Sequence, residues 1–123
     1  MKNVKCNIIQ GGDKMDIEQV VMDIIIQSGE ARGCAHEALS MANEGNFIGA
    51  DKTMEEANSA IGRAHEVQTS LIQKEASGEK LEISVLFVHA QDHLMTAITE
   101  KNLIEEIIEL RRRLQPVFEK NNL

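Results

Sequence analysis

Two histidines and an aspartate lie close together in the last third of the chain, in the run Val88-His89-Ala90-Gln91-Asp92-His93-Leu94-Met95-Thr96. With His89 at position i, Asp92 at i+3 and His93 at i+4, the three side chains share one side of a helix. A neutral imidazole is nucleophilic near pH 7, and it can accept a phosphoryl group, bind a metal ion or move protons. This cluster is therefore the candidate functional site of the chain.

The neighbours of the cluster fit some of these reactions better than others. Phosphoryl transfer needs hydrogen-bond donors that steady the phosphoryl oxygens, and Gln91, His93 and Thr96 are close enough in sequence to supply them. A zinc site fits less well, because the ligands would spread over roughly 140° of helix arc and no Cys lies close in sequence. No nucleotide-binding motif is present, so a phosphoryl group would have to arrive on another protein.

Two long amphipathic segments precede the one that carries the cluster. The first is predicted to be a helix from residue 16 to 44, starting in a capping box at Asp16 and stopping at Gly45. Its inner face carries Ile17, Val21, Ile24, Ser28, Ala31, Ala35, Ala38 and Ala42. The second helix is capped by Asn46 and ends at about residue 76, before a Ser-Gly pair. Its predicted inner face is more polar and carries Phe47, Met54, Ile61, His65, Gln68 and Ile72.

The third helix is predicted to start near Ser84 and to reach Leu114, where Pro116 either stops the helix or kinks its continuation. Residues 1–15 show little periodicity and contain a Gly-Gly-Asp turn signal, which predicts a mobile leader. The remaining residues, 16–123, are enough for one domain with one core. Because the connections are short, we predict an all-α, antiparallel three-helix bundle.

The third helix carries two faces that need burial. One stripe, of Leu86, Ala90, Ala97, Ile104 and Ile108, can face the other two helices. A separate seam at three-four spacing consists of Val85, His89, Asp92, Thr96, Thr99, Leu103, Ile107, Leu110 and Leu114. A single three-helix chain leaves the apolar half of this seam exposed, which predicts a homo-oligomer of two, three or four chains.

Copies of Asp92 would converge on the axis of such an oligomer, because Asp92 lies in the seam. Like carboxylates repel one another and raise each other's pKa unless they share a proton or a cation. A hard divalent ion such as Mg²⁺, which prefers oxygen ligands, would relieve that repulsion. We therefore expect Mg²⁺ or another divalent cation at the axis.

Composition excludes several classes of partner. The net charge of −7 works against a nucleic-acid role, because binding to a phosphate backbone needs clustered Lys and Arg. No apolar stretch approaches the roughly 18 residues of a membrane span, so no direct membrane insertion is expected. Cys6 and Cys34 are only two thiols, too few for a disulfide framework, and with the absence of a signal peptide they predict a cytoplasmic protein.

The nine-residue run resembles the IIA component of the lactose/N,N'-diacetylchitobiose (cellobiose) family of the bacterial phosphoenolpyruvate-dependent sugar phosphotransferase system. The segments Ala64-His65-Glu66-Val67-Gln68-Thr69 and Ala76-Ser77-Gly78-Glu79 add to the resemblance, which covers roughly residues 17–115. Members of that family are cytoplasmic homotrimers of three-helix bundles. The resemblance therefore implies a homotrimer here, assembled through the third helix.

The resemblance also implies roles for the residues of the cluster. His89 would receive a phosphoryl group from the small histidine phosphocarrier protein and pass it to a cysteine of the IIB component. Gln91 matches a polar neighbour of the phosphohistidine, His93 would support it, and Asp92 matches an aspartate that binds a metal ion at the trimer axis. Such a carrier would support uptake of a β-linked disaccharide of the diacetylchitobiose/cellobiose or lactose type.

A partner protein needs access to a phosphohistidine. We therefore expect His89 to be partly exposed in a cleft between subunits, beside an apolar rim of Val85, Leu86 and Val88.

A second class of function stays open on the residues alone. In it the protein is a metal-binding helical oligomer or scaffold, and His89, Asp92 and His93 are ligands without covalent chemistry. The other histidines are expected to be structural: His36 as an ordinary exposed residue, and His65 in a buried polar contact with Gln68.

Overall fold

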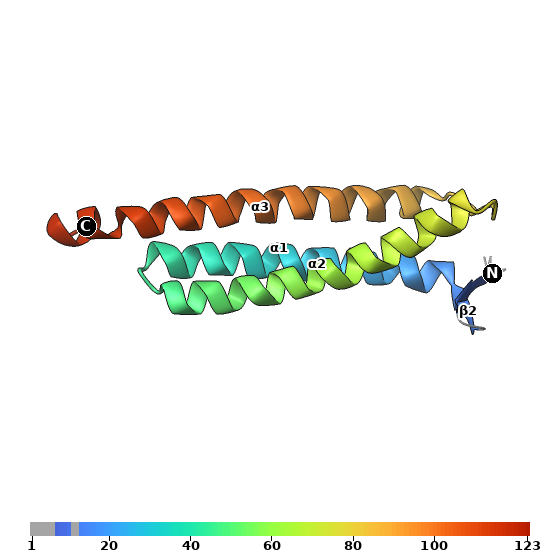
Figure 1. The fold of residues 1–123 in the computed structure, drawn as a ribbon, viewed down its shortest axis with the longest axis horizontal. Coiled ribbons are helices and arrows are strands. Elements are labelled where there is room, and N and C mark those ends of the chain that lie inside the picture. Colours follow the sequence, from blue (N-terminus) through green and yellow to red (C-terminus); the bar gives the residue numbers. More distant parts are fainter. Residues whose placement is uncertain (1–6, 11–12) are drawn as a thin grey trace.

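Three long helices account for most of the computed structural model, which describes residues 7–10 and 13–123. Helix α1 spans Ile17–Asn43, α2 spans Phe47–Ala76 and α3 spans Val85–Lys120. They run antiparallel, and α1 packs against both α2 and α3 (Figure 1). The predicted three-helix bundle is confirmed.

Local capping explains where the helices begin and end. The side chain of Asn46 accepts a hydrogen bond from the backbone N–H of Gly49 at 3.0 Å, and Ser84 caps α3 in the same way at 3.0 Å. Gly45 and Gly78 follow the first two helices with φ of +83° and +103°, a region that glycine enters without steric cost. The sequence predicted these boundaries correctly, because each depends on residues next to the helix end.

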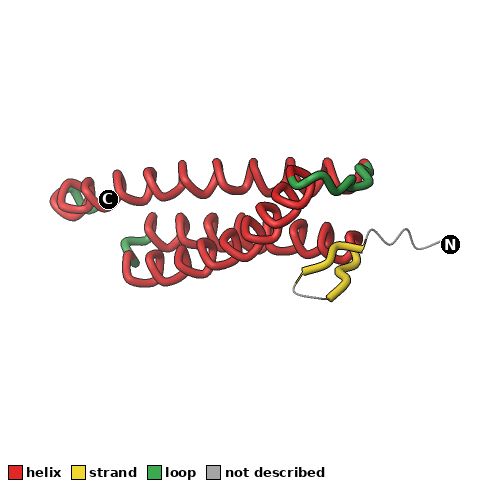
Figure 2. Tube along the Cα trace, turned by 45° about the vertical axis from the view of Figure 1, so that its right-hand side comes forward, coloured by secondary structure: helices red, strands yellow, loops and turns green. Residues whose placement is uncertain are grey.

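Two short strands precede α1 where the sequence predicted only a mobile leader. Strand β1, Asn7–Gln10, pairs antiparallel with β2, Asp13–Asp16, and lies at the same end of the bundle as the α2–α3 loop (Figure 2). Four residues are too few to show a clear alternation in sequence, which is why the strands were missed. Residues 1–6 and 11–12, with Cys6 and the Gly-Gly pair, lie outside the described residues.

Helix α3 continues past Pro116, so of the two predicted alternatives the stop after Leu114 is wrong. Proline removes one backbone donor and kinks a helix, and Figure 2 shows the last turns bending away from the earlier axis. Side-chain contacts hold these turns in place, because the guanidinium of Arg111 lies 4.0 Å from the ring centroid of Phe118. The kink that the sequence offered as an alternative is what the chain adopts.

The core is made largely of small side chains. All eight inner positions predicted for α1 are buried, four of them alanines. The inner face predicted for α2 is right for Met54 and Gln68, but Ile72 is 56 % exposed and His65 is also exposed. The face that α2 buries carries Ala50, Thr53, Met54, Ala57, Ala60, Ala64, Gln68 and Leu71. Alanines on this face allow the helix backbones to approach closely, while His65 and Ile72, one position beyond Ala64 and Leu71, lie outside it.

Helix α3 has the two faces that the sequence predicted. Ala90, Leu94, Ala97, Ile104 and Ile108 are buried against the bundle, while Leu86 is 42 % exposed and only borders it. On the seam, the side chains of Leu103, Ile107 and Leu110 are 60 %, 47 % and 58 % exposed. One chain therefore leaves an apolar face of α3 uncovered.

In the described part of the chain, none of the helices combines the length and the apolar composition that crossing a membrane requires.

Candidate functional site

His89 and His93 lie in the first three turns of α3, near the loop that joins it to α2. Their rings stack, with centroids 5.9 Å apart and planes inclined by 27°. His89 is exposed and His93 is half-buried. Val85 and Val88 beside His89 are 88 % and 56 % exposed, so the predicted apolar rim is accessible in a single chain.

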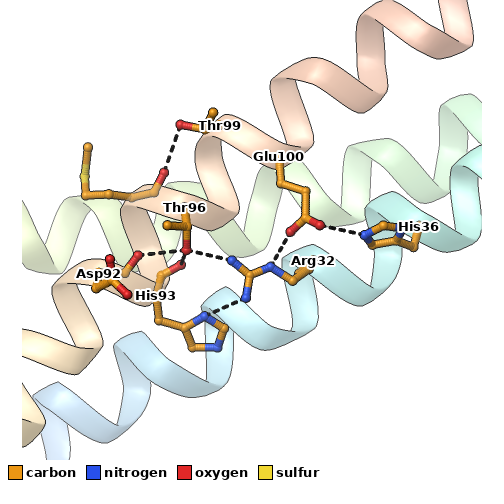
Figure 3. A network of polar contacts seen from close by, with 8 residues as sticks. Arg32, His36, Asp92, His93, Thr96, Thr99 and Glu100 are labelled. Carbon is orange, nitrogen blue, oxygen red and sulfur yellow. Dashed lines mark hydrogen bonds and ion pairs between the residues drawn. The ribbon is translucent and has the colours of Figure 1, made fainter.

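Arg32 of α1 holds the inner histidine of this pair from across the bundle (Figure 3). Its Nη1 lies 3.0 Å from Nδ1 of His93, and its Nη2 donates to Oγ1 of Thr96 at 2.7 Å. Its Nε forms an ion pair with Glu100. One guanidinium thus contacts three consecutive turns of α3, and its planar, rigid fork suits such a role.

The network continues from Arg32 to a second histidine on α1. The other oxygen of Glu100 lies 2.9 Å from Nε2 of His36, one turn beyond Arg32. The hydrogen bond from His36, together with Arg32, lowers the pKa of the Glu100 carboxyl. His36 is exposed as predicted, but it has a partner, so it is more than an ordinary surface residue.

The environment of His93 favours a neutral ring. Burial lowers its pKa below the ordinary 6.5, and the positive charge of Arg32 and the neighbouring imidazole of His89 lower it further. A ring that stays neutral near pH 7 keeps one nitrogen as an acceptor and one as a donor. His93 can therefore bind a basic group on one side and an anionic oxygen on the other.

Gln91 is held by α2. The amide nitrogen of Gln68 donates to Oε1 of Gln91, and it also lies 3.6 Å from the sulfur of Met95. Because the oxygen of Gln91 is engaged, its NH₂ group remains as a donor. Gln68 takes this contact in place of the predicted one with His65, which is exposed.

Comparison with known proteins gives this arrangement a context. Residues 19–112 match the family described as "PTS system, Lactose/Cellobiose specific IIA subunit". The N,N'-diacetylchitobiose-specific EIIA component of Escherichia coli K12 is 45 % identical over 100 residues, covering 81 % of this chain and 86 % of that protein. The chain belongs to this family. The IIA subunits of sugar phosphotransferase systems are phosphotransferase components, and this chain is therefore one of them.

Solved IIA structures share the fold. The cellobiose-specific enzyme IIA of Bacillus anthracis has a TM-score of 0.79 and 48 % identity, covering 87 % of this chain and 98 % of that one. The IIA(Chitobiose) of Escherichia coli, solved in complex with HPr, has a TM-score of 0.71 and 42 % identity, covering 82 % and 98 %. The resemblance predicted from the nine-residue run is confirmed by both sequence and fold.

A metal ion does not fit the site of a single IIA chain. Asp92 is exposed on the seam, and within the described residues no group of three or more His, Cys, Asp or Glu side chains is arranged to hold an ion. One carboxylate is too few ligands for a cage, since hard cations bind several oxygens. A divalent ion fits Asp92 only where several copies of the chain bring their carboxylates together.

Sequence reasoning missed Arg32 and Glu100, which connect the cluster to α1. The available signal was the spacing of Arg32 and His36, one turn apart on the first predicted helix. That signal is weak, because charged pairs at this spacing are common on exposed helix faces. Of the predicted site residues, His89 and His93 lie together, Gln91 faces α2 and Asp92 faces away on the seam.

Proposed function

We propose that this IIA subunit carries a phosphoryl group on His89. In the first half-reaction a ring nitrogen of His89 attacks phosphorus, and the phosphorus–nitrogen bond in the phosphohistidine of the histidine phosphocarrier protein breaks. In the second, a cysteine thiolate of the IIB component attacks the same phosphorus, and the bond to His89 breaks. Phosphoryl transfer asks little acid–base chemistry of the protein, so positioning and electrostatics govern the rate.

The exposed imidazole of His89 beside the neutral ring of His93 carries this proposal. A phosphohistidine needs a nucleophilic nitrogen that a partner protein can reach, and exposure of His89 meets that need. Hydrogen-bond donors must also face the phosphoryl oxygens, and His93 and Gln91 can supply them. The relative solved with HPr supports the same first partner here.

The exposed seam of α3 supports assembly as a homotrimer. Three copies would cover the apolar side chains of Leu103, Ile107 and Leu110 and bring Asp92 of each chain to the axis. In that arrangement Mg²⁺ or a similar divalent cation would neutralise the converging carboxylates. Its role would be to hold the assembly together, since the phosphoryl chemistry needs only protein groups.

The proposed sugar is a β-linked disaccharide of the diacetylchitobiose, cellobiose or lactose type, in keeping with relatives that are named for each of these sugars. A IIA subunit contacts only its protein partners, so its own residues give no direct reading of the sugar.

Phosphorylation of the full chain tests this function. The protein is mixed with labelled phosphoenolpyruvate, the general phosphotransferase enzyme and the histidine phosphocarrier protein. We expect an acid-labile, base-stable label that is lost in His89→Gln and kept in His65→Gln, a control that replaces an exposed histidine of α2. Addition of a IIB component should then move the label to its cysteine.

The same assay decides between the two classes of function. If the wild-type chain takes no label, or if His89→Gln is labelled as fully as the wild type, the carrier proposal is rejected. Absence of label together with stoichiometric binding of a metal ion that needs His89 and His93 would establish the scaffold alternative.

A further inference from the structure

We propose that Arg32 is a positioning residue, which fixes the His93 ring so that Nδ1 is the acceptor and the proton lies on Nε2, ready to donate to a phosphoryl oxygen on His89. The second half of this statement rests on the proposed phosphorylation of His89. The first half concerns Arg32 and His93 alone.

The chemistry of the two groups sets the tautomer. A guanidinium has only donors, so the nitrogen that faces it, Nδ1 of His93 at 3.0 Å from Nη1, must accept. A neutral imidazole has a single ring proton, which this contact places on Nε2. Within the described residues Nε2 has no hydrogen-bond partner of its own, so its donor is available.

Nε2 of His93 faces a glycine of α1. It lies over Gly29 of α1, close enough that a Cβ added there would be 3.7 Å away. Because glycine has no side chain, no polar group from this position competes for the proton. The ring centroids of His93 and His89 are 5.9 Å apart, and a phosphoryl group on His89 would extend into this separation to accept from Nε2.

Arg32 can impose this orientation because its own position is fixed. Its other contacts, to Thr96 at 2.7 Å and to Glu100, use its other two nitrogens, Nη2 and Nε. Glu100 is in turn held by His36 at 2.9 Å. A side chain bound at three points cannot rotate freely, so the hydrogen bond to His93 keeps one geometry.

A lysine at position 32 would preserve the positive charge but not the planar arrangement of N–H donors. Its single ammonium can reach one or two of the three partners, since it lacks a planar set of donors. Arg32→Lys is therefore the conservative variant, and Arg32→Met removes every donor while keeping a long aliphatic side chain. Arg63→Met is the matched control, because Arg63 is an exposed arginine of α2 that contacts Gln27 and lies outside the network.

The first measurement is the ¹⁵N spectrum of the histidine rings in the intact, unphosphorylated chain at mildly alkaline pH. We expect His93 to show only the tautomer protonated at Nε2 in the wild type and in Arg63→Met. In Arg32→Met we expect a mixture of both tautomers in exchange, and in Arg32→Lys an intermediate result. An unchanged His93 spectrum in Arg32→Met overturns the inference.

The second measurement is steady-state phosphoryl transfer from the histidine phosphocarrier protein. Loss of an oriented donor should lower kcat of Arg32→Met about tenfold and leave KM for the carrier unchanged, with partial recovery in Arg32→Lys. A change in KM alone would assign Arg32 to partner docking and overturn the positioning role. A kcat equal to that of Arg63→Met would also overturn it.

The two proposals fail separately. If the wild type takes no phosphoryl group while the ring spectra change as expected, the carrier function is rejected and the tautomer assignment stands. If His89 is labelled normally while the ring spectra do not respond, the positioning role of Arg32 is rejected alone. Should Arg32→Met lose its helical circular dichroism, Glu100→Gln replaces it, because it loosens Arg32 without removing a group from His93, and the same two outcomes decide.

Discussion

The imidazole rings of His89 and His93 stack one helical turn apart, with centroids 5.9 Å from each other. The pair is asymmetric, because His89 is exposed and His93 is half-buried and contacts Arg32. One ring is therefore accessible to a partner protein, and the other is oriented by the bundle. This division between a nucleophile and an oriented neighbour underlies the first prediction.

Protonation of His93 should couple the stability of the protein to pH. Its folded-state pKa is lowered from 6.5, so the unfolded chain binds the proton more readily than the folded chain. This contribution to stability is fully present above pH 6.5 and is lost as pH falls from 6.5 through the lowered folded-state pKa. Urea unfolding between pH 5 and pH 7.5 should show this slope in the wild type and a smaller one in His93→Gln. Equal slopes in the two proteins would contradict the prediction.

Removal of a buried hydroxyl should stabilise the bundle. Ser28 is fully buried on α1, and within the described residues its Oγ has no hydrogen-bond partner. Ser28→Ala should raise the free energy of unfolding in urea by about 1 kcal/mol beyond the gain in helix propensity. Ser59→Ala, at an exposed position of α2, is the control that carries only the propensity gain. Equal gains would show that the buried hydroxyl costs nothing.

Charges placed on the exposed seam of α3 should separate the subunits. Leu103 and Ile107 are 60 % and 47 % exposed in one chain, and a trimer would bury them. The double substitution of both residues by Glu should weaken assembly at least about a hundredfold and leave helical content unchanged, as measured by sedimentation and circular dichroism. Ile48→Glu, at an 87 % exposed position of α2, should assemble like the wild type. A monomeric wild type would reject the proposed trimer.

Divalent cations should stabilise the assembly through Asp92. At a Mg²⁺ concentration about 100 times the Kd, the wild-type assembly should gain about 2.7 kcal/mol, seen as a higher Tm. Asp92→Asn should not respond to Mg²⁺, and without the ion it should assemble more tightly than the wild type because the carboxylates no longer repel. The control is Asp23→Asn, at an exposed position of α1. If chelation leaves the wild type unchanged, no cation is bound at the axis.

Local sequence determined the three helices and the placement of the two histidines of the site on one helix. The caps at Asn46 and Ser84 and the glycines at 45 and 78 lie beside the ends that they define, so the boundaries followed from neighbouring residues. The spacing of His89 and His93 follows from the repeat of a single helix, and so does the spare apolar seam of α3. Each of these features depends on residues a few positions apart, which a sequence displays directly.

Tertiary packing decided which residues meet across helices. Arg32 and His93 are 61 positions apart, and their contact depends on how α1 and α3 are rotated and shifted against each other. The same packing chose the alanine face of α2 over the larger residues beside it, and so exposed His65. A helix repeat fixes the direction of side chains around its own axis but leaves open the offset between two helices. That offset is set by the summed fit of many small side chains, and it appears only once the bundle has formed.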